Sequence, residues 1–278
     1  MKPISFPKIS VVSACFNHGK YINEMIESVL NQTFQDFEII IVDDGSTDNS
    51  REILNEIKND RIKVIFSEHS GPAAARNQAI KFARANFILN LDADDKILQD
   101  YLEKAYEIFS INPKAGIVYT NCSYFGAQSG IMERGQYNLK GMLAKNKIVS
   151  AALFLKEDWM KVGGYSEDFK YGLEDWDLWL NIIETGREIV KIPDSCIFYR
   201  KYKDPSESRS GRRISDRNKT IHSMSLIFSR HRELYSLYPA IYRRFSKFEN
   251  ANGNEMIIIK CIKDCIFKVK QQFHFLIN

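Results

Sequence analysis

The sequence predicts an α/β protein with a mostly parallel central sheet, flanked by helices and followed by a helical C-terminal extension. Two observations support this fold class. Over the first half of the chain, short apolar strands alternate with segments of helical apolar spacing, which is the pattern of βαβ units. Beyond residue 205 the pattern is helical and the composition is basic.

The elements of the first half alternate from the N-terminus onward. Ile9–Cys15 is apolar and rich in β-branched residues, as buried strands are, whereas Tyr21–Leu30 has apolar residues at helical spacing. The same two patterns recur up to residue 91. They predict strands at Phe37–Val42, Ile62–Phe66 and Phe87–Leu91, and helices around Ile53–Ile57 and over about Ala73–Arg84.

After residue 97 the patterns are weaker. We expect residues 123–147 to form loops or a short hairpin, and the polar segment Lys203–Arg217 to form a mobile loop. The other predicted elements are helices at Leu98–Phe109, Lys156–Val162 and Leu173–Ile183, and strands at Gly116–Thr120 and Ser150–Leu155.

Composition limits the function classes. With 278 residues and 44 % hydrophobic content the chain can bury a sizeable core, and a net charge of +4 is too small to indicate nucleic-acid binding. The five cysteines are scattered without zinc spacing, as expected for a reduced cytosolic protein. Because the sequence has no signal-peptide pattern and no apolar run long enough to span a membrane, we expect a cytoplasmic protein.

Polar residues gather where three predicted strands end, at Asn17-His18, Asp43-Asp44 and Asp92-Ala93-Asp94. The carboxyl ends of parallel strands are where such sheets bind ligands. The chain has neither GxGxxG nor GxxxxGKS/T, so dinucleotide-binding and P-loop functions lose support. These strand ends therefore predict a ligand site of another kind.

The pair Asp92 and Asp94 has two interpretations. Side chains alternate along a strand, so the two carboxylates would share one side if the strand continued through them. Such a pair suits Mg²⁺ or Mn²⁺, which prefer oxygen ligands and keep positions open for phosphate oxygens. Alternatively the group only begins a helix, with Asp95 capping Lys96-Ile97-Leu98.

Two further acidic groups also have two interpretations. Asp43-Asp44-Gly45-Ser46 either contacts a nucleoside or forms a turn in which Ser46 or Thr47 caps the next helix. Glu174-Asp175-Trp176-Asp177 precedes a helical apolar run, so its acids suit a helix N-terminus. A Trp between carboxylates is also an arrangement that binds a sugar ring near a base.

Together these segments resemble the family 2 glycosyltransferases, inverting enzymes with the GT-A fold, a Rossmann-like α/β architecture. The similarity covers about residues 8–200 and rests on five segments in the correct order. They are ISVVSACFNHGKYI, SVLNQTFQDFEIIIVDDGSTDNS, GPAAARNQAI, ILNLDADD and GGYSEDFKYGLEDWDLWL. The resemblance implies transfer of a sugar from a nucleotide diphosphate sugar, with uridine favoured, to a hydroxyl of a glycan, glycoprotein or lipid-linked acceptor.

The resemblance assigns donor-binding roles to residues of the first half. Phe16 stands where the family usually has Tyr beside the base, and the pair beginning at Ala14 replaces the usual Pro-Thr, so this strand end would bind the base through its backbone. Asp44 matches the acid that pairs with uracil, and Arg76 matches an Arg near the base or the diphosphate. Asn17 is also expected to contact the donor.

The remaining motifs are matched to the metal, the base and the acceptor. Asp92-Ala93-Asp94 matches the D-x-D motif, whose first acid lies nearer the ribose and whose second acid binds Mn²⁺ or Mg²⁺. Asp175 matches the catalytic base, with Asp177 as an alternative. Glu174 and Trp176 are expected to contact the acceptor.

The chain departs from the family at the end of its last strand. Tyr202 stands near the place of a family histidine, so a metal or phosphate role for a histidine there is in doubt, and Lys201, Lys203 and Arg209 become candidates for contacting the diphosphate. Two other functions stay open, an inactive nucleotide-binding or scaffold module and a sugar-1-phosphate nucleotidyltransferase. The second would need a Gly-rich basic loop after the first strand, where this chain has CFNHGKYI.

The resemblance suggests a catalytic domain over residues 1–205, with a nucleotide-binding half (about 1–97) and an acceptor-binding half (about 98–205), and an extension over 206–278. Ile241–Asn278 holds seven Lys or Arg against three acids, an excess equal to the net charge of the whole chain. Apolar residues recur at helical spacing over Ile258–Phe273. This helix either docks on the catalytic domain or on a second copy in a homodimer, or it lies on an anionic membrane near a lipid-linked acceptor.

Overall fold

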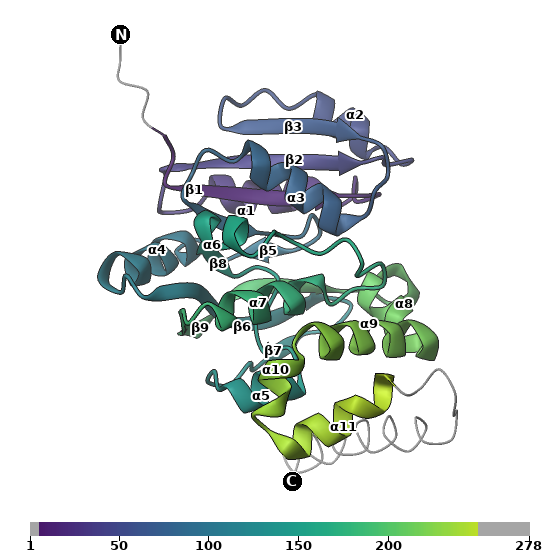
Figure 1. Ribbon diagram of the computed structural model, residues 1–278. Helices are drawn as coiled ribbons and strands as arrows, with labels where there is room; N and C mark the ends of the chain where they lie inside the picture. Colours follow the sequence, from purple (N-terminus) through teal and green to yellow (C-terminus); the bar gives the residue numbers. More distant parts are fainter. Residues whose placement is uncertain (1–5, 250–278) are drawn as a thin grey trace.

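The computed structural model describes residues 6–249 of the chain. Within them, nine strands form one sheet in the order β3-β2-β1-β4-β8-β6-β9-β5, with β7 paired to β6 (Figure 1). The first four strands, β1 (Ile9–Cys15), β2 (Phe37–Asp44), β3 (Ile62–Ser67) and β4 (Phe87–Asn90), pair with one another in parallel. This half of the sheet therefore has the parallel arrangement that alternating strands and helices predict.

The helices between these strands are α1 (Ile22–Leu30), α2 (Ser50–Asn55) and α3 (Pro72–Phe82). The predicted alternation of strands and helices is confirmed. Two boundaries differ from the prediction: β2 runs two residues further and includes Asp44, and α2 ends before Ile57. The acids that the sequence suggested as a turn are therefore the last residues of a buried strand.

The second half of the sheet is mixed. Its strands are β5 (Lys96–Ile97), β6 (Ala115–Gly126), β7 (Gly130–Met132), β8 (Leu153–Leu155) and β9 (Glu188–Lys201). Its helices are α4 (Tyr101–Ile111), α5 (Leu139–Ala144), α6 (Lys156–Lys161) and α7 (Glu174–Glu184). Strand β8 runs antiparallel to β4 and β6, whereas β9 runs parallel to β6 with interruptions in its register.

Three local expectations are corrected in this half. Asp95 does not cap a helix, because Lys96–Ile97 is a strand and α4 begins only at Tyr101. The segment 123–147 contains the expected hairpin of β6 and β7, but also α5, whose N-cap Asn138 accepts a hydrogen bond from the backbone of Gly141. Its polar composition concealed that short helix.

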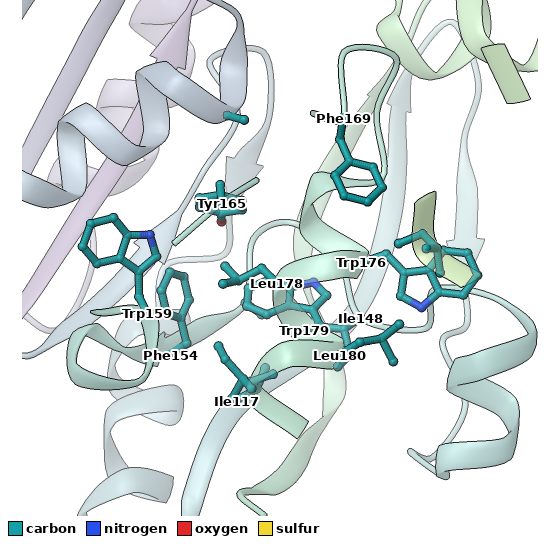
Figure 2. Close-up of a cluster of buried hydrophobic side chains, with 14 of the residues drawn as sticks. Ile117, Ile148, Phe154, Trp159, Tyr165, Phe169, Trp176, Leu178, Trp179 and Leu180 are labelled. Carbon is teal, nitrogen blue, oxygen red and sulfur yellow. The ribbon is translucent and has the colours of Figure 1, made fainter. Parts of the chain in front are cut away.

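Helices cover both faces of the sheet, and each face has its own apolar core. On one face Val12 and Val42 pack with Ile80 of α3 and with the buried residues of α6 and α7. On the other face Val11 and Ile41 pack with α1 and α4. Figure 2 shows the first core around α7, where Leu178 and its neighbours meet aromatic rings from β8, from α6 and from the loop after α6. This packing positions the N-terminus of α7.

The last described helices are α8 (Arg209–Ser215), α9 (Arg217–Arg230), α10 (Arg232–Ser236) and α11 (Pro239–Glu249). The prediction of a mobile loop at Lys203–Arg217 is wrong, because Ser208 caps α8 and the segment folds onto the domain. Tyr235 donates to the carbonyl of Leu143, 2.9 Å away, which joins α10 to α5. None of the helices within residues 6–249 is both long and apolar enough to cross a bilayer. The helix expected at Ile258–Phe273 lies outside the described residues.

Candidate active site

The loops after β1 and β2 are joined by Asn17. Its backbone has a φ of +58°, a left-handed conformation that Asn tolerates better than most residues. Its amide N–H donates to Ser46 Oγ at 3.0 Å, and its side-chain oxygen accepts from the Thr47 N–H at 2.7 Å. The capping roles suggested for Ser46 and Thr47 are wrong, because α2 begins after Asn49 without a side-chain cap. The donor contact of Asn17 stays a prediction.

Phe16 and His69 form an aromatic pair beside Asp44. Their ring centroids are 4.2 Å apart, and Phe16 is 39 % exposed. His69 Nδ1 lies 3.0 Å from Asp44 Oδ2. The buried Asp44 carboxylate also accepts from the backbone N–H groups of Ser70 at 2.7 Å and Gly71 at 2.9 Å. Asp44 thus pins the loop before α3, and its predicted contact with uracil stays a prediction.

Two predicted donor contacts lack polar side chains. Ala14 is half-buried in β1, and Ala93 is buried between the two acids of the D-x-D motif. Any contact with a donor would therefore come from backbone atoms, as the sequence suggested for Ala14.

Asp92 and Asp94 lie on a tight turn rather than on an extended strand. Strand β4 ends at Asn90, and the N–H of Asp95 donates to the carbonyl of Asp92 at 3.0 Å. Asp92 accepts from Arg76 Nη2 at 2.7 Å and from Ser150 Oγ at 3.2 Å. The expected continuation of the strand is therefore wrong, although both carboxylates remain partly exposed at its end.

Asp94 has a different set of partners. Tyr202 donates its hydroxyl to Asp94 Oδ2 at 2.5 Å, and His18 Nδ1 lies 3.7 Å from Asp94 Oδ1. Burial raises the pKa of Asp94 and outweighs the opposing effect of His18, and the charge of Asp92 raises it further. In Asp92 burial also acts to raise the pKa, but the Arg76 guanidinium outweighs it and holds the pKa below its ordinary value.

The donor set around Asp94 fits a divalent cation in part. Negative charge is in excess at Asp94, and a cation would relieve it. His18 Nδ1 is buried without a hydrogen-bond partner among the described residues and faces the same carboxylate. No group of three or more His, Cys, Asp or Glu side chains within residues 6–249 is arranged to hold a metal. Such an ion would therefore depend on oxygen atoms of water or a ligand as well.

Arg76 connects the D-x-D turn to the N-terminus of α7. Its guanidinium is nearly buried and donates through Nη1 to Glu174 Oε1 at 2.6 Å while Nη2 contacts Asp92. Arg209 of α8 donates to the same Glu174 oxygen at 2.6 Å. Glu174 is 4 % exposed, and Leu173 before it has a φ of +82°, a costly conformation for a non-glycine residue. Such strain concentrates where the surrounding structure holds a functional geometry.

Asp175 lies next to this ion-pair cluster. Asn146 Nδ2 donates to its Oδ2 at 3.0 Å, and the Trp176 N–H donates to its Oδ1 at 2.8 Å. Burial and the neighbouring charge of Glu174 raise the pKa of Asp175 to about 6. A carboxylate of this kind is mostly ionised at neutral pH and is a stronger base than an ordinary aspartate.

The next two residues of α7, Trp176 and Asp177, are buried and contact other parts of the protein. Trp176 is 2 % exposed and donates its indole N–H to the Met142 carbonyl at 3.1 Å, so protein covers the ring (Figure 2). The contact between Trp176 and a sugar stays a prediction, and the burial of the ring does not favour it. Asp177 is fully buried against Arg230 and His231, at 2.7 Å and 3.0 Å, so the alternative base assignment is wrong.

The structure adds residues that the sequence analysis missed. Asn146 donates to Asp175 and Ser150 donates to Asp92, both from an irregular segment, and His69 lies against Asp44. No periodicity or motif marks them, because their partners lie far away in sequence. Of the cations suggested for the diphosphate, Arg209 is already paired with Glu174.

Comparison with known proteins places the chain among glycosyltransferases. The family model described as glycosyl transferase family 2 matches residues 10–170. The chain belongs to this family. Chondroitin synthase of Pasteurella multocida (strain Pm70) is 29 % identical over 189 residues, which are 65 % of this chain and 19 % of that protein. The putative teichuronic acid biosynthesis glycosyltransferase TuaG of Bacillus subtilis is 39 % identical over 127 residues, 45 % of this chain and 50 % of that protein. The chain thus spans between about a fifth and half of the length of these two relatives.

Two solved structures have the same fold. TarS residues 1–349 of S. aureus, in complex with UDP-GlcNAc, aligns with a TM-score of 0.71 and 19 % identity over 93 % of this chain and 80 % of that one. The mannosyltransferase PcManGT of Pyrobaculum calidifontis, in complex with GDP-Man and Mn²⁺, aligns with a TM-score of 0.61 and 18 % identity over 94 % and 80 %. The GT-A α/β fold expected from the sequence is confirmed by these alignments.

Proposed function

We propose that this glycosyltransferase family member is an inverting enzyme that uses a nucleotide diphosphate sugar, with UDP as the carrier. The acceptor is a hydroxyl of a glycan or lipid-linked saccharide in the synthesis of a bacterial surface polysaccharide. The observation that carries the proposal is the Arg76 bridge, because one guanidinium joins Asp92 of the D-x-D motif to Glu174 beside Asp175. A base and the donor-side acids are therefore held close together.

The similar proteins support the substrate classes. TarS has been solved with UDP and with UDP-GlcNAc, and PcManGT with GDP-Man. The names of TuaG and of chondroitin synthase refer to the synthesis of polysaccharides. These likenesses favour a nucleotide sugar as donor and a polysaccharide as product.

In the proposed reaction Asp175 acts as the general base. An acceptor hydroxyl has a pKa far above neutral, so it must lose its proton as it attacks the anomeric carbon. Asp175 Oδ2 is held by Asn146, and the carboxylate retains lone pairs to receive that proton. Attack opposite the leaving group inverts the anomeric centre without a second carboxylate as nucleophile. Arg76 and Arg209 hold Glu174, which keeps the first turn of α7 in place.

The D-x-D acids would hold Mn²⁺ or Mg²⁺. Asp94 would bind the ion through Oδ1, while Tyr202 fixes its other oxygen, and Asp92 lies on the same turn. When bound, the ion neutralises the negative charge that develops on the leaving diphosphate. PcManGT, which contains Mn²⁺, supports this choice of metal.

The proposal includes the division of the chain suggested by the sequence. Asp44, Asp92 and Asp94 belong to the nucleotide-binding half at about 1–97, whereas Asn146 and Asp175 belong to the acceptor-binding half at about 98–205. The helices after residue 205 would then support α7 and the acceptor side, since α8 and α10 contact these parts.

A nucleotide titration tests the donor assignment. Purified protein is titrated with UDP, TDP, GDP and ADP, with Mn²⁺ and after chelation, beside Asp94→Asn and the exposed control Asp60→Asn. We expect metal-dependent binding of UDP that Asp94→Asn loses and the control keeps. Failure of all four nucleotides to bind would contradict the transferase proposal and favour an inactive scaffold.

Transfer assays test the base. Asp175→Asn should retain UDP binding and lose transfer by about 10²- to 10⁴-fold, the usual contribution of general-base catalysis. Product analysis by NMR of the new anomeric centre gives the stereochemistry. Parental transfer rates in Asp175→Asn would show that the base assignment is wrong, while a retained anomeric configuration would contradict the inverting mechanism.

A further inference from the structure

Beside Asp175 the structure has a group of positively charged side chains, here called the cationic cluster. Its members come from three separated parts of the chain: the segment around α5, the end of β9, and α8. They are Arg134, Lys145, Lys147, Lys201 and Arg213. None of them carries a role in the mechanism proposed above.

Hydrogen bonds tie the cluster to the candidate base. Arg134 Nη1 donates to the carbonyl of Asn146 at 3.3 Å, and Asn146 in turn donates to Asp175 at 3.0 Å. Lys145 and Lys147 flank Asn146 in the sequence. One short segment therefore carries both a direct partner of the base and three of the five cations.

The other two cations reach the same place from the C-terminal side. The Arg213 side chain lies over Gly172, where an added Cβ would be 3.4 Å from its Nε, two residues before Glu174. Burial is the largest cause that lowers the pKa of Lys201, and the positive charge of nearby Arg134 is the second. Burial also lowers the pKa of Lys145, followed by the charges of Arg134 and Lys147.

These cations lack acidic partners. None of the five forms an ion pair within 4.0 Å with an acid in the part of the chain that the structure describes, whereas Arg76 and Arg209 both do. Arg134 Nε is buried without a hydrogen-bond partner among residues 6–249. Asp175 and Glu174 act on Arg213, and Asp95 acts on Lys201, only from beyond ion-pair distance. Like charges held together raise the energy of the folded state, and an anionic ligand would lower it.

Aromatic rings accompany the charges. Lys201 Nζ lies 4.3 Å from the ring centroid of Tyr124 and 5.1 Å from that of Tyr199. Both tyrosines are partly exposed. An aromatic surface next to cations offers apolar contact to a sugar ring and charge to its substituents.

We propose that the cationic cluster is a subsite for an anionic acceptor, a saccharide chain that carries carboxylate or phosphate groups. The inference rests on the proposed function, because it assigns the cluster to the acceptor that Asp175 deprotonates. An ionised Asp175 repels an anionic acceptor, and the surrounding cations offset that repulsion. The acceptor hydroxyl would lie at Asp175 with its nearest anionic groups at Arg134, Lys201 and Arg213.

Binding measurements with defined probes test the subsite. The protein, saturated with UDP and Mn²⁺, is titrated calorimetrically with a chondroitin tetrasaccharide, its carboxyl-reduced form, a ribitol phosphate oligomer and neutral chitotetraose. We expect one or both anionic probes to bind and the neutral probes to bind at least tenfold more weakly. The two anionic probes distinguish carboxylate from phosphate. Binding of the anionic probes should also weaken as salt is raised, because exposed charges are screened.

Variants localise the effect. The anionic probe should bind about tenfold more weakly to the double variant Arg134→Gln/Lys201→Gln, and also to the single variant Arg213→Gln. It should bind to the charge-conserving double variant Arg134→Lys/Lys201→Arg as tightly as to the parental protein. Lys58→Gln/Lys81→Gln, which removes two exposed cations elsewhere, is the matched control and should have no effect. UDP affinity and thermal unfolding, measured on each sample, report whether a variant is folded.

The outcomes separate the two proposals. UDP binding together with equal affinity for neutral and anionic probes, or no binding of any anionic probe to the parental protein, would overturn the subsite alone. The subsite proposal would also be overturned if the control Lys58→Gln/Lys81→Gln lost as much affinity for the anionic probe as the cluster variants do. Absence of UDP binding would overturn the transferase proposal, and with it the assignment of the cluster to an acceptor.

Discussion

Arg76 on α3 donates to Glu174 at the start of α7, with Nη1 2.6 Å from Oε1, although 98 positions separate the two residues in sequence. The second arm of the same guanidinium reaches Asp92 at 2.7 Å. Arg76 is 6 % exposed and Glu174 is 4 % exposed, so the pair is held away from water. Removing either partner would leave a buried charge with one ion pair fewer, because Glu174 then keeps only Arg209 and Arg76 keeps only Asp92. One side chain thus connects the helix that carries Asp175 to the turn that carries the D-x-D motif.

Arg76→Lys is expected to reduce both stability and activity. An ammonium group lacks the fork that lets guanidinium donate to two carboxylates in fixed directions. We expect the free energy of unfolding to fall by about 1–3 kcal/mol and kcat to fall by about 10²-fold, the cost of a small misplacement of reacting groups. Urea unfolding and steady-state transfer assays measure the two effects. Arg84→Lys, at the more exposed pair with Glu38, is the control and should keep its activity. Unchanged kcat in Arg76→Lys would contradict the bridging role.

The transfer rate should depend on the protonation of Asp175. Burial and Glu174 raise its pKa from 3.8 to about 6, and the base acts only when ionised. We therefore expect kcat/KM to be level above this pKa and to fall tenfold per pH unit below about 6. An ordinary aspartate would show that fall near its usual pKa of 3.8 instead. A pH–rate profile with subsaturating acceptor measures it, and a rate that stays level down to about pH 4 would be inconsistent with the raised pKa.

Tyr202→Phe should weaken metal binding without abolishing it. The hydroxyl holds Asp94 Oδ2 at 2.5 Å and so orients the carboxylate that would bind the ion. Loss of such a supporting hydrogen bond typically costs about tenfold or more in metal affinity. Mn²⁺ titration in the presence of UDP, followed by electron paramagnetic resonance, gives the affinity. Tyr106→Phe is the control, because its ring packs between Phe34 and Phe87 away from Asp94. Equal Mn²⁺ affinity in Tyr202→Phe and the control would refute the orienting role.

The stability of the protein should fall as pH rises, through His231. This buried ring lies between Asp177, 3.0 Å from Nε2, and Glu184, 3.1 Å from Nδ1, and it can donate to both only as imidazolium. Burial acts to lower its pKa, but the two carboxylates outweigh burial and raise the pKa above the ordinary 6.5. A raised folded-state pKa adds stability that is fully present below the unfolded pKa and is lost as pH rises through the folded one.

Urea unfolding across a pH series measures this contribution of His231. We expect the free energy of unfolding to decrease from about pH 6 upward, and His231→Gln to remove that part of the decrease. Arg230 shares Asp177 with the histidine, with Nε 2.7 Å from the same Oδ1. His222→Gln, an exposed histidine on α9, is the control. An unchanged pH slope in His231→Gln would mean that the ring is not the titrating group.

Most of the fold of the first half could be predicted from the sequence because each element carries its own periodic pattern. Ile9–Cys15 and Phe37–Asp44 are buried on both faces, so most of their positions are apolar. The polar segment Lys203–Arg217 was harder to interpret. Its α8 is held by contacts such as Arg209 with Glu174, which no local pattern reveals.

The candidate site divides in the same way. Asp44, Asp92, Asp94 and Asp175 follow recognisable motifs, and the structure gathers Asp92 and Asp175 around Arg76 and its partner Glu174. Asn146, Ser150 and His69 have no motif, and their positions depend on contacts with residues distant in the sequence. Trp176 was interpreted as an acceptor contact, which its burial does not favour, because an aromatic residue at helical spacing fits a core equally well.

The sequence by itself determined the fold class, the family and the order of the acidic motifs, because strand and helix patterns and short motifs are local properties of the chain. Tertiary structure alone decided which acid has a raised pKa and which is fully buried in ion pairs. Asp175 and Asp177 are two residues apart, yet one faces Asn146 and the other is fully buried against His231. Burial and neighbouring charges set the properties of a carboxylate, and both come from residues brought together only by folding.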